Sequence, residues 1–393
     1  MKRRDFLGAA LAPLVLAGCD YTLEDGVFNE CRDPRSGKFS AHPLVAAAWQ
    51  GLRPDRVWDV HVHLFGNGRG TQGVWIDPDF DHGWGPGNRA RRTLFMNGAC
   101  VGSDEDRLDG RMVKRLADAM DQFPPGAKAV LLAFDFTFDE QGRKQPERTT
   151  FSVSDDYARS VVKARPDRFE WIASVHPYRE DAVTALEAAK RNGARAVKWL
   201  PPSMDIDLAN PRCRPAFDAM VRLDLPLLVH VGEEKAVPGA GREDLADPLL
   251  LRHPLEAGVR VIGAHCASLG AGNFQRFEQL MAERRYEGRL FGDIAATPQA
   301  NRHGLVREIL LHRDWDGRLL NGSDYPLPGV VPLFSLNDLA KRGLLDEKAV
   351  PVLRELRQAN ALLFDFVLKR CLTADGRRFP DVTFETRNFF EKA

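Results

Sequence analysis

Short apolar runs recur along this chain and alternate with longer segments whose apolar positions repeat at helical spacing. Apolar runs of about four to eight residues, bounded by glycine, proline or charge, are typical of buried strands. Such runs predict strands at residues 57–63, 128–134, 170–175, 195–199, 226–230, 258–264, 288–293 and 318–323. Because strands and helices alternate, the pattern predicts a parallel sheet that closes into a (β/α)8 TIM barrel.

Helix boundary signals support this alternation. One helix is expected to end at Asn192-Gly193, where the glycine acts as a stop, and another to open near Pro215. The apolar stretch at residues 359–370 is expected to be the final helix. The barrel is therefore predicted over residues 57–370, followed by a C-terminal tail, residues 371–393.

Two segments do not follow the alternation of strands and helices. Residues 20–56 are rich in glycine, proline and charge and predict an irregular N-terminal arm. Residues 66–110 are predicted as a long loop inserted after the first strand. A loop of this length in a compact domain is usually functional, and this one follows a strand on the expected active face.

The N-terminus predicts an export signal over residues 1–19. Three basic residues, Lys2 to Arg4, precede an apolar stretch that is too short to span a bilayer and that ends at Cys19. The basic residues resemble a twin-arginine signal, although Lys2 and Gly8 depart from its fuller pattern and leave the general secretory route open. A basic signal in which Cys19 is incidental is the simpler alternative.

The four residues that end at Cys19 resemble a bacterial lipobox, in which cleavage precedes acylation of the cysteine. Asp20 resembles the residue that keeps lipoproteins on the inner membrane. The resemblance implies lipidation of Cys19, a periplasmic location and contact with the membrane through this anchor only.

Five further cysteines follow the signal: Cys31, Cys100, Cys213, Cys266 and Cys371. Because this number is odd, at least one thiol stays unpaired within the chain, even in a compartment that allows disulfides. No Cys-x-x-Cys spacing occurs, so the sequence does not suggest a zinc knuckle. Cys266 is expected to be a small, packed apolar residue.

Composition excludes some functions. Lys plus Arg equals Asp plus Glu, at 55 each, so no net field recruits nucleic acid or an anionic surface. A small-molecule substrate is the expected partner, and a homo-oligomer stays open.

Residues able to bind a metal stand at the ends of the predicted strands. The carboxyl ends of parallel barrel strands converge on one face, so residues far apart in sequence can share a metal there. The pair His61 and His63 is two apart on one strand and points both imidazoles to the same side. Imidazole and carboxylate ligands favour Zn²⁺, with Mn²⁺, Fe²⁺ or Co²⁺ also compatible. The predicted ligands are His61, His63, Lys198, His230, His265 and Asp324.

This ordered set resembles the amidohydrolase superfamily. The segments WIASVHPYREDA, GARAVKWLPPS and LNGSDYP are more narrowly similar to its amidohydrolase-2 branch, which includes hydrolases, lactonases and non-oxidative decarboxylases. The resemblance implies a metal-dependent enzyme on a TIM barrel. It leaves the reaction open.

The chemical state of Lys198 distinguishes the possible reactions. A protonated amine beside a divalent cation is strongly repelled, so this lysine must be modified or must point away from the metal. In superfamily members with this residue, the amine can form a carbamate that bridges two ions, one held by His61, His63 and Asp324. The resemblance then implies hydrolysis of an amide, lactone or ester by a metal-bound hydroxide, with Asp324 moving the proton. The other interpretations are a free Lys198 that binds an anionic substrate, and a structural lysine whose head points outward.

The runner-up function is a mononuclear zinc decarboxylase of an aromatic or unsaturated carboxylic acid. In that arrangement His61, His63, His230 and Asp324 hold one ion, and His265 acts directly on the substrate. A second alternative is a lipid-anchored binding protein that has lost catalysis.

Other residues near the predicted strand ends are candidates for substrate contact or ligand orientation. Those assigned to substrate are His176, Arg179 and Trp199, and the loop residues Trp84, Glu233 and Glu234 are expected to overhang the site. Asp135 and Asp293 are expected to orient ligands or substrate.

Overall fold

The computed structural model describes residues 22–36, 39–69, 73–82, 86–102, 105–237, 241–302 and 304–391. The export signal, with the lipidation site Cys19, and the loop residue Trp84 lie outside these described residues. Within them, no helix has both the length and the apolar character needed to cross a membrane.

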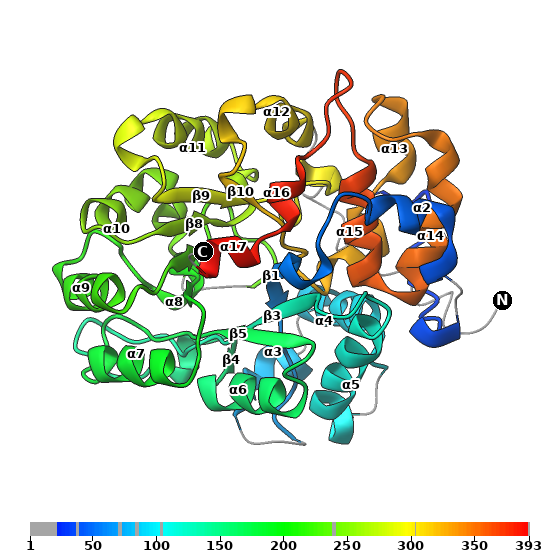
Figure 1. Cartoon of the computed structure of the whole chain (residues 1–393). Coiled ribbons are helices and arrows are strands. Elements are labelled where there is room, and N and C mark those ends of the chain that lie inside the picture. Colours follow the sequence, from blue (N-terminus) through cyan, green and yellow to red (C-terminus); the bar gives the residue numbers. More distant parts are fainter. Residues whose placement is uncertain are drawn as a thin grey trace.

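Eight parallel strands form the barrel (Figure 1). They are β1 Trp58–His63, β3 Lys128–Leu132, β5 Phe169–Ile172, β6 Val197–Trp199, β7 Leu227–Val229, β8 Val261–Gly263, β9 Leu290–Asp293 and β10 Leu319–Leu320. They pair in two runs, β1-β3-β5 and β6-β7-β8-β9-β10. Parallel bridges from Ala173 to Val197 and from Val62 to Tyr325 join these runs at both seams. The predicted TIM barrel is therefore confirmed.

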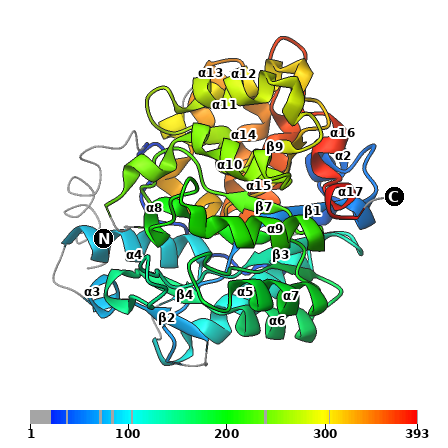
Figure 2. The ribbon, with the colours of Figure 1, turned by 90° about the vertical axis from the view of Figure 1, so that its left-hand side faces the viewer.

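Helices surround the strands, as Figures 1 and 2 show from two sides. The predicted stop after Arg191 and the start beside Pro215 are confirmed. The apolar stretch does form a helix, but it is not the final one, because short helices follow it. The helices are α2 Pro43–Ala48, α3 Pro78–His82, α4 Pro86–Ala99, α5 Leu108–Met120, α6 Asp155–Ala164, α7 Ala182–Arg191, α8 Pro201–Met204, α9 Arg214–Leu223, α10 Arg252–Glu256, α11 Asn273–Ala282, α12 Leu305–Leu311, α13 Leu336–Lys341, α14 Val350–Ala359, α15 Ala361–Cys371, α16 Asp381–Phe384 and α17 Arg387–Phe390.

The C-terminal segment closes the amino end of the barrel. Phe389 of α17 packs into the apolar cluster inside the barrel, together with Trp58 and Val60 of β1. The hydroxyl of Thr386 donates a hydrogen bond to the backbone carbonyl of Trp58. Phe389 is therefore part of the barrel core, and residues 381–390 form the short helices α16 and α17, although the sequence predicts a tail.

The insertion after β1 is more ordered than the loop predicted from the sequence. Within residues 66–110 lie helices α3 and α4 and the strand β2, Val74–Ile76. β2 pairs antiparallel with β4, Phe151–Val153, which comes from a separate connection. The sequence pattern missed α3 and β2 because each is short, and it missed α4 because that helix lacks a regular apolar repeat. The insertion forms a structured wall beside the carboxyl end of the barrel.

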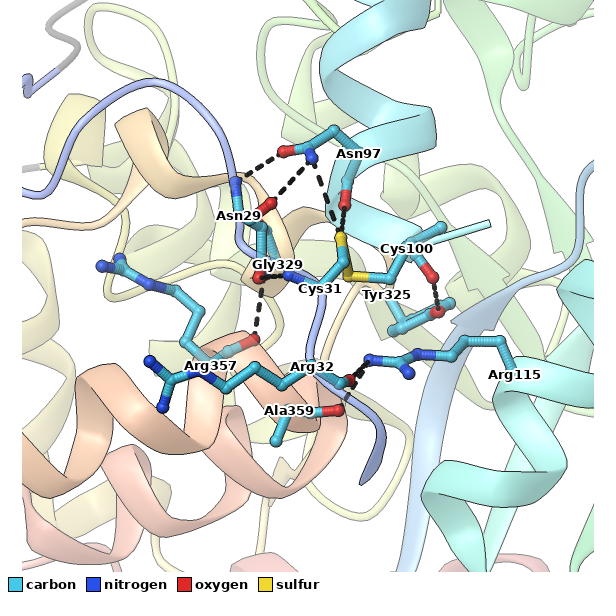
Figure 3. The surroundings of a disulfide bond; sticks show 11 residues. Asn29, Cys31, Arg32, Asn97, Cys100, Arg115, Tyr325, Gly329, Arg357 and Ala359 are labelled. Carbon is cyan, nitrogen blue, oxygen red and sulfur yellow. Dashed lines mark hydrogen bonds between the residues drawn. A yellow bond between two sulfur atoms is a disulfide. The ribbon is translucent and has the colours of Figure 1, made fainter. Parts of the chain in front are cut away.

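A disulfide ties the N-terminal arm to this wall (Figure 3). Cys31 of the arm is bonded to Cys100 at the end of α4, with 5.2 Å between the Cα atoms. The side chain of Asn97 supports the link by accepting from the Asn29 N–H and donating to the Asn29 carbonyl. The remaining cysteines of the described chain carry free thiols: Cys213, Cys266 and Cys371. The arm therefore holds α4, which faces the cavity described next.

Candidate metal centre

A cavity of about 170 Å³ lies at the carboxyl end of the barrel strands. All six predicted ligands line it, which brings together residues separated by more than 260 positions in the chain. Its walls are largely apolar and come from the insertion and from the segment after β10: Phe65, Phe80, Leu94, Phe95, Leu327 and Val330. An apolar enclosure with a few convergent polar groups is the usual form of a small-molecule site.

A register shift in β1 directs both histidines of this strand into the cavity. The parallel pairing of β1 with β3 shifts between Asp59 and Val62. Val60 therefore belongs to the barrel interior, whereas Val62 packs in the outer apolar layer. His61 and His63 both reach the cavity, with Val62 on the opposite side, as the sequence predicts.

Two cavity residues have left-handed backbone conformations that non-glycine side chains disfavour. His265, in the turn after β8, has φ 58°, and Asp324, in the segment after β10, has φ 61°. Such conformations cost about 1–3 kcal/mol each and cluster at functional sites. The Asp324 N–H donates to the His61 carbonyl at 2.8 Å, which holds this strained residue beside β1.

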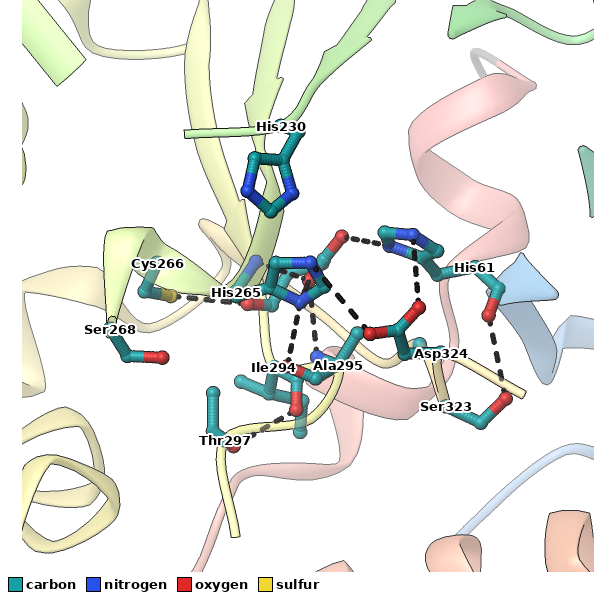
Figure 4. Close-up of polar contacts among 12 residues, drawn as sticks. His61, His230, His265, Cys266, Ser268, Ile294, Ala295, Thr297, Ser323 and Asp324 are labelled. Carbon is teal, nitrogen blue, oxygen red and sulfur yellow. Dashed lines mark hydrogen bonds and ion pairs between the residues drawn. The ribbon is translucent and has the colours of Figure 1, made fainter. Parts of the chain in front are cut away.

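Imidazole nitrogens converge on the Asp324 carboxylate (Figure 4). His63 Nε2 lies 3.1 Å from Asp324 Oδ1, and His61 Nε2 lies 3.6 Å from the same oxygen. His265 Nε2 is 3.8 Å from Asp324 Oδ2. The ligating atoms of His61, His63 and Asp324 all lie within 4.8 Å of one another, close enough to share one ion.

Asp293, at the end of β9, orients two of these histidines. Its Oδ2 is 2.9 Å from His61 Nδ1, and its Oδ1 accepts from the His265 N–H at 2.7 Å. His265 Nδ1 is 3.0 Å from the carbonyl of Ala295. With Nδ1 donating in both rings, the Nε2 lone pairs of His61 and His265 face the cavity. The predicted orienting role of Asp293 agrees with this geometry.

Burial and mutual contacts set the charges at the centre. Burial lowers the pKa of His61 to about 4 and lowers the pKa of His265 well below its usual value. Burial raises the pKa of Asp324, but His265, His61 and the hydrogen bond from His63 outweigh it and hold that pKa well below its ordinary range. Neutral imidazoles and an ionised carboxylate are the forms that bind metals.

Lys198 points into this centre. Its side chain is 1% exposed, and its Nζ lies 3.4 Å from His61 Nε2. The interpretation of an outward-pointing structural lysine is therefore wrong. Burial lowers the pKa of Lys198 to about 8, so a larger fraction of this amine is neutral near physiological pH than in an ordinary lysine.

His230 lines the cavity wall but stands apart from the cluster of ligating atoms. Its Nε2 is 3.2 Å from the Gly232 carbonyl, and its Nδ1 is 3.4 Å from Glu234 Oε2. Its ring centroid is 5.3 Å from that of His265. Within the described residues, neither group of ligating atoms close enough to share an ion includes His230.

The donor set fits a divalent metal. His61 Nε2 and His265 Nε2 face an ionised carboxylate, and nitrogen and oxygen donors of this kind are the usual ligands of zinc. Zinc bonds of about 2.0–2.2 Å place tetrahedral ligand atoms roughly 3.3–3.6 Å apart. The distances from Asp324 to the three imidazoles are close to this range. His61, His63 and Asp324 would hold the ion, with His265 and Lys198 beside it.

The residues predicted to bind substrate lie elsewhere. His176 is buried, with its Nε2 bonded to the Met204 carbonyl. Trp199 is also buried and donates from Nε1 to the Val175 carbonyl.

Arg179 forms ion pairs with Asp135 and Asp181. These three substrate-binding candidates and Asp135 are absent from the cavity lining in the described chain. Glu233 and Glu234 do line it.

Sequence reasoning missed the segment after β9. Gln299, Asn301 and Arg302 line the cavity, and Gln299 and Arg302 are buried. This segment has no strand-end histidine or carboxylate pattern. Its only signal is its position after a barrel strand, where active-site loops occur.

Comparison with known proteins identifies the family. The profile described as Amidohydrolase, that of the amidohydrolase-2 family, matches residues 58–355. No curated protein matches. Among solved structures, an uncharacterised TIM-barrel protein from Bordetella bronchiseptica is 16% identical, with a TM-score of 0.46, covering 75% of this chain and 94% of that one.

Two enzymes are also among the similar structures. A probable 2-pyrone-4,6-dicarboxylic acid hydrolase from Acinetobacter baumannii is 14% identical, with 80% and 99% coverage and a TM-score of 0.46. A 5-carboxyvanillate decarboxylase from Novosphingobium aromaticivorans, with bound manganese, is 12% identical, with 87% and 97% coverage and a TM-score of 0.43.

The profile match extends from the start of β1 into α14 and includes every barrel strand and all six predicted ligands. This chain therefore belongs to the amidohydrolase family, in its amidohydrolase-2 branch.

Proposed function

We propose that this chain is a metal-dependent hydrolase that cleaves an amide, lactone or ester bond in a small molecule. The observation that carries this proposal is the convergence of His61, His63 and His265 on the ionised Asp324 carboxylate inside an enclosed cavity. Zn²⁺ is the proposed metal, with Mn²⁺, Fe²⁺ or Co²⁺ as substitutes. The complete ligand set disfavours a binding protein that has lost catalysis.

A bound divalent metal would supply a water that ionises near neutral pH and would polarise the scissile carbonyl. Asp324 accepts the proton of the attacking water and transfers it to the leaving group. Its strained backbone and its hydrogen bond to β1 fix the carboxylate for this task. His265 presents Nε2 towards the same space because its Nδ1 is bound to the Ala295 carbonyl. The apolar walls exclude bulk water from the reacting groups.

Lys198 is proposed to complete the centre as a carbamate. The neutral Nζ attacks CO₂, an N–C bond forms, and the proton leaves to solvent, which converts a cation into an anionic ligand. The position of Nζ, 3.4 Å from His61 Nε2, supports this assignment because the new carboxylate would extend among the metal ligands. A second ion held with His230 and His265 would then be bridged to the first.

Decarboxylation of an aromatic or unsaturated acid is the second candidate. The observation that favours it is the position of Lys198, whose amine lies beside the group formed by His61, His63 and Asp324 and could bind an anionic substrate there. His265 would then act directly on the substrate. Release of CO₂ from a carboxylic acid substrate would separate this reaction from hydrolysis.

We also propose export to the periplasm and anchoring through lipidated Cys19. The disulfide between Cys31 and Cys100 supports this proposal, because such bonds persist in oxidising compartments. The substrate is then a small molecule met outside the cytoplasm.

Substitution Cys19→Ala tests the anchor. We expect exported but uncleaved protein that no longer incorporates labelled fatty acid, because acylation requires that thiol. Metabolic palmitate labelling and the mass of the N-terminus check this result, with Cys371→Ala as the control. Normal cleavage and release of Cys19→Ala protein would contradict the lipoprotein proposal.

Substitution Asp324→Asn separates metal coordination from proton transfer. Asn keeps the size and one oxygen ligand but cannot accept the proton, so kcat should fall about 10²- to 10⁴-fold while KM changes far less. Steady-state kinetics on an ester, lactone and amide panel, with metal content measured in parallel, check this expectation. Asp218→Asn, at an exposed ion pair, is the matched control. Near-normal turnover at equal metal content would contradict proton transfer by Asp324. It would favour the decarboxylase proposal, in which His265 acts on the substrate.

Substitution Lys198→Ala tests the carbamate bridge. Metal content should fall from two ions towards one per chain, and activity should fall with it. A short carboxylic acid, added in bicarbonate-free buffer, should restore part of the activity by replacing the carbamate. Elemental analysis and kinetics measure both effects. Full metal content and full activity in this variant would refute the bridge.

A further inference from the structure

Both halves of the disulfide between the N-terminal arm and α4 have an unfavourable backbone. Cys31 and Cys100 each have φ 56°, a left-handed conformation that residues other than glycine, asparagine and aspartate rarely adopt. Cys100 directly follows α4, at the position where helices commonly place a glycine. Both cysteines are partly exposed, so a reagent in solution can reach the bond. An exposed disulfide between two residues in unfavourable conformations is typical of the labile, regulatory kind.

The arm joins two walls of the cavity. On one side, the disulfide and the hydrogen bonds between Asn29 and Asn97 hold the end of α4 (Figure 3). On the other side, Asn29 Nδ2 donates to the Gly329 carbonyl at 3.2 Å, and the Thr22 N–H donates to the Pro332 carbonyl at 2.9 Å. The arm therefore bridges α4 and the segment that follows β10.

Both bridged elements line the cavity. α4 contributes Leu94, Phe95 and Met96, and the segment after β10 contributes Leu327 and Val330. All five side chains are apolar, so the arm holds a part of the wall that shapes the cavity without supplying any predicted metal ligand. A change in the attachment of the arm therefore acts first on this apolar wall.

Contacts at the end of α4 connect the wall to the metal centre. The hydroxyl of Tyr325, the residue after Asp324, donates to the Ala99 carbonyl at 3.1 Å. The backbones of α4 and of the turn that contains Gly329 pack directly against each other, since a Cβ on that glycine would clash with the Gly98 carbonyl. Displacement of the last turn of α4 therefore affects the segment that carries Asp324.

We propose that the disulfide between Cys31 and Cys100 is a redox-sensitive tether that controls the apolar wall of the cavity. With the bond intact, the arm holds the last turn of α4 against the segment after β10. After reduction, the two cysteines can leave their unfavourable conformations, and the end of α4 loosens. The tether concerns the cavity of the proposed enzyme, so its effect on turnover rests on the proposed function, whereas the loosening of α4 does not.

The chemical step is thiol–disulfide exchange with a dithiol. One thiolate of the dithiol attacks a sulfur of the disulfide, the S–S bond breaks, and the second thiol then displaces the mixed disulfide. The dithiol thereby transfers two electrons and two protons to the two cysteines and becomes a disulfide itself. A protein disulfide as oxidant reverses the step.

The loop closed by this bond explains why reduction acts on α4 and leaves the barrel intact. The two cysteines are 69 residues apart, and a disulfide across a long loop strongly restricts the segments that it joins. The loop also contains β1, but β1 is held by its parallel pairing with β3. Under the proposed export, the wall is therefore held in place only after the chain has left the reducing cytoplasm.

Hydrogen exchange of the full-length protein, followed by mass spectrometry before and after reduction with dithiothreitol, tests the tether without turnover. Amides of residues 90–101 and 325–333 should exchange about 10- to 100-fold faster after reduction, because the constraint of a long closed loop is lost. Amides of α11, which packs on β9, should keep their rates. In the active enzyme, kcat/KM should fall about tenfold on reduction at unchanged metal content, and re-oxidation should restore it.

Cysteine variants provide the matched comparison. Untreated Cys100→Ser protein should exchange like reduced wild type and should not respond to dithiothreitol, and Cys31→Ser provides a second test if Cys100→Ser does not fold. Cys371→Ser, at a thiol that is free in the described chain, should respond to dithiothreitol as the wild type does.

Equal exchange of residues 90–101 in oxidised and reduced wild type would overturn the proposal. Equal acceleration in α11 would also overturn it, because the disulfide would then stabilise the whole fold. Faster exchange of α4 with unchanged kcat/KM would overturn control of the cavity. If the oxidised protein hydrolyses no ester, lactone or amide, the proposed function fails, while hydrogen exchange still decides whether the tether holds α4.

Discussion

The ionised Asp324 carboxylate lies in a buried pocket opposite imidazole nitrogens, and the carboxyl end of the barrel is arranged around this set of donor atoms. A metal ion would complete the set, since neutral imidazoles and an ionised carboxylate are ready ligands. Asp293 fixes the ring orientation of His61 and holds the backbone of His265. Because the ligand positions come from β1 and from the turns after β8 and β10, the closure of the barrel itself assembles the centre.

A second buried network, formed by Asp59, Asp365 and Lys369, supports the backbone around His61 and Asp324. Asp59 Oδ1 accepts the N–H groups of His61 and Ser323 and so links β1 to the segment before Asp324. Lys369 of α15 donates to the Gly322 carbonyl and pairs with Asp365. Burial raises the pKa of Asp59 to about 6 and that of Asp365 to about 7. This network stabilises the strained backbone at Asp324, as catalytic geometry requires.

The sequence predicts the barrel well because the spacing of apolar residues and the metal-binding residues at the strand ends are local signals. The order of strands in a parallel barrel was then enough to place His61 and Asp324 at the same face. His176 could not be excluded, because the sequence does not say which way a residue beyond the end of a strand turns. Trp199 belongs to β6 and follows Lys198 directly, so strand alternation places its side chain on the face opposite to that of Lys198. His230 was expected among the ligands, but the carbonyl of Gly232 and Glu234 hold its ring at the wall. Arg302 was missed because its segment carries no strand-end histidine or carboxylate, and only the packed structure places it in the cavity wall beside Ser268 and Gln299.

The central claim is that Asp324 and the neighbouring imidazoles form a metal centre with Lys198 at its edge. A high-resolution crystal structure of zinc-replete protein, with anomalous data collected at the zinc edge, tests it most directly. The account predicts an anomalous peak between His61, His63 and Asp324, with extra density on Lys198 Nζ for a carbamate and a second peak beside it. A map from zinc-saturated crystals with no peak between these three side chains would contradict the account.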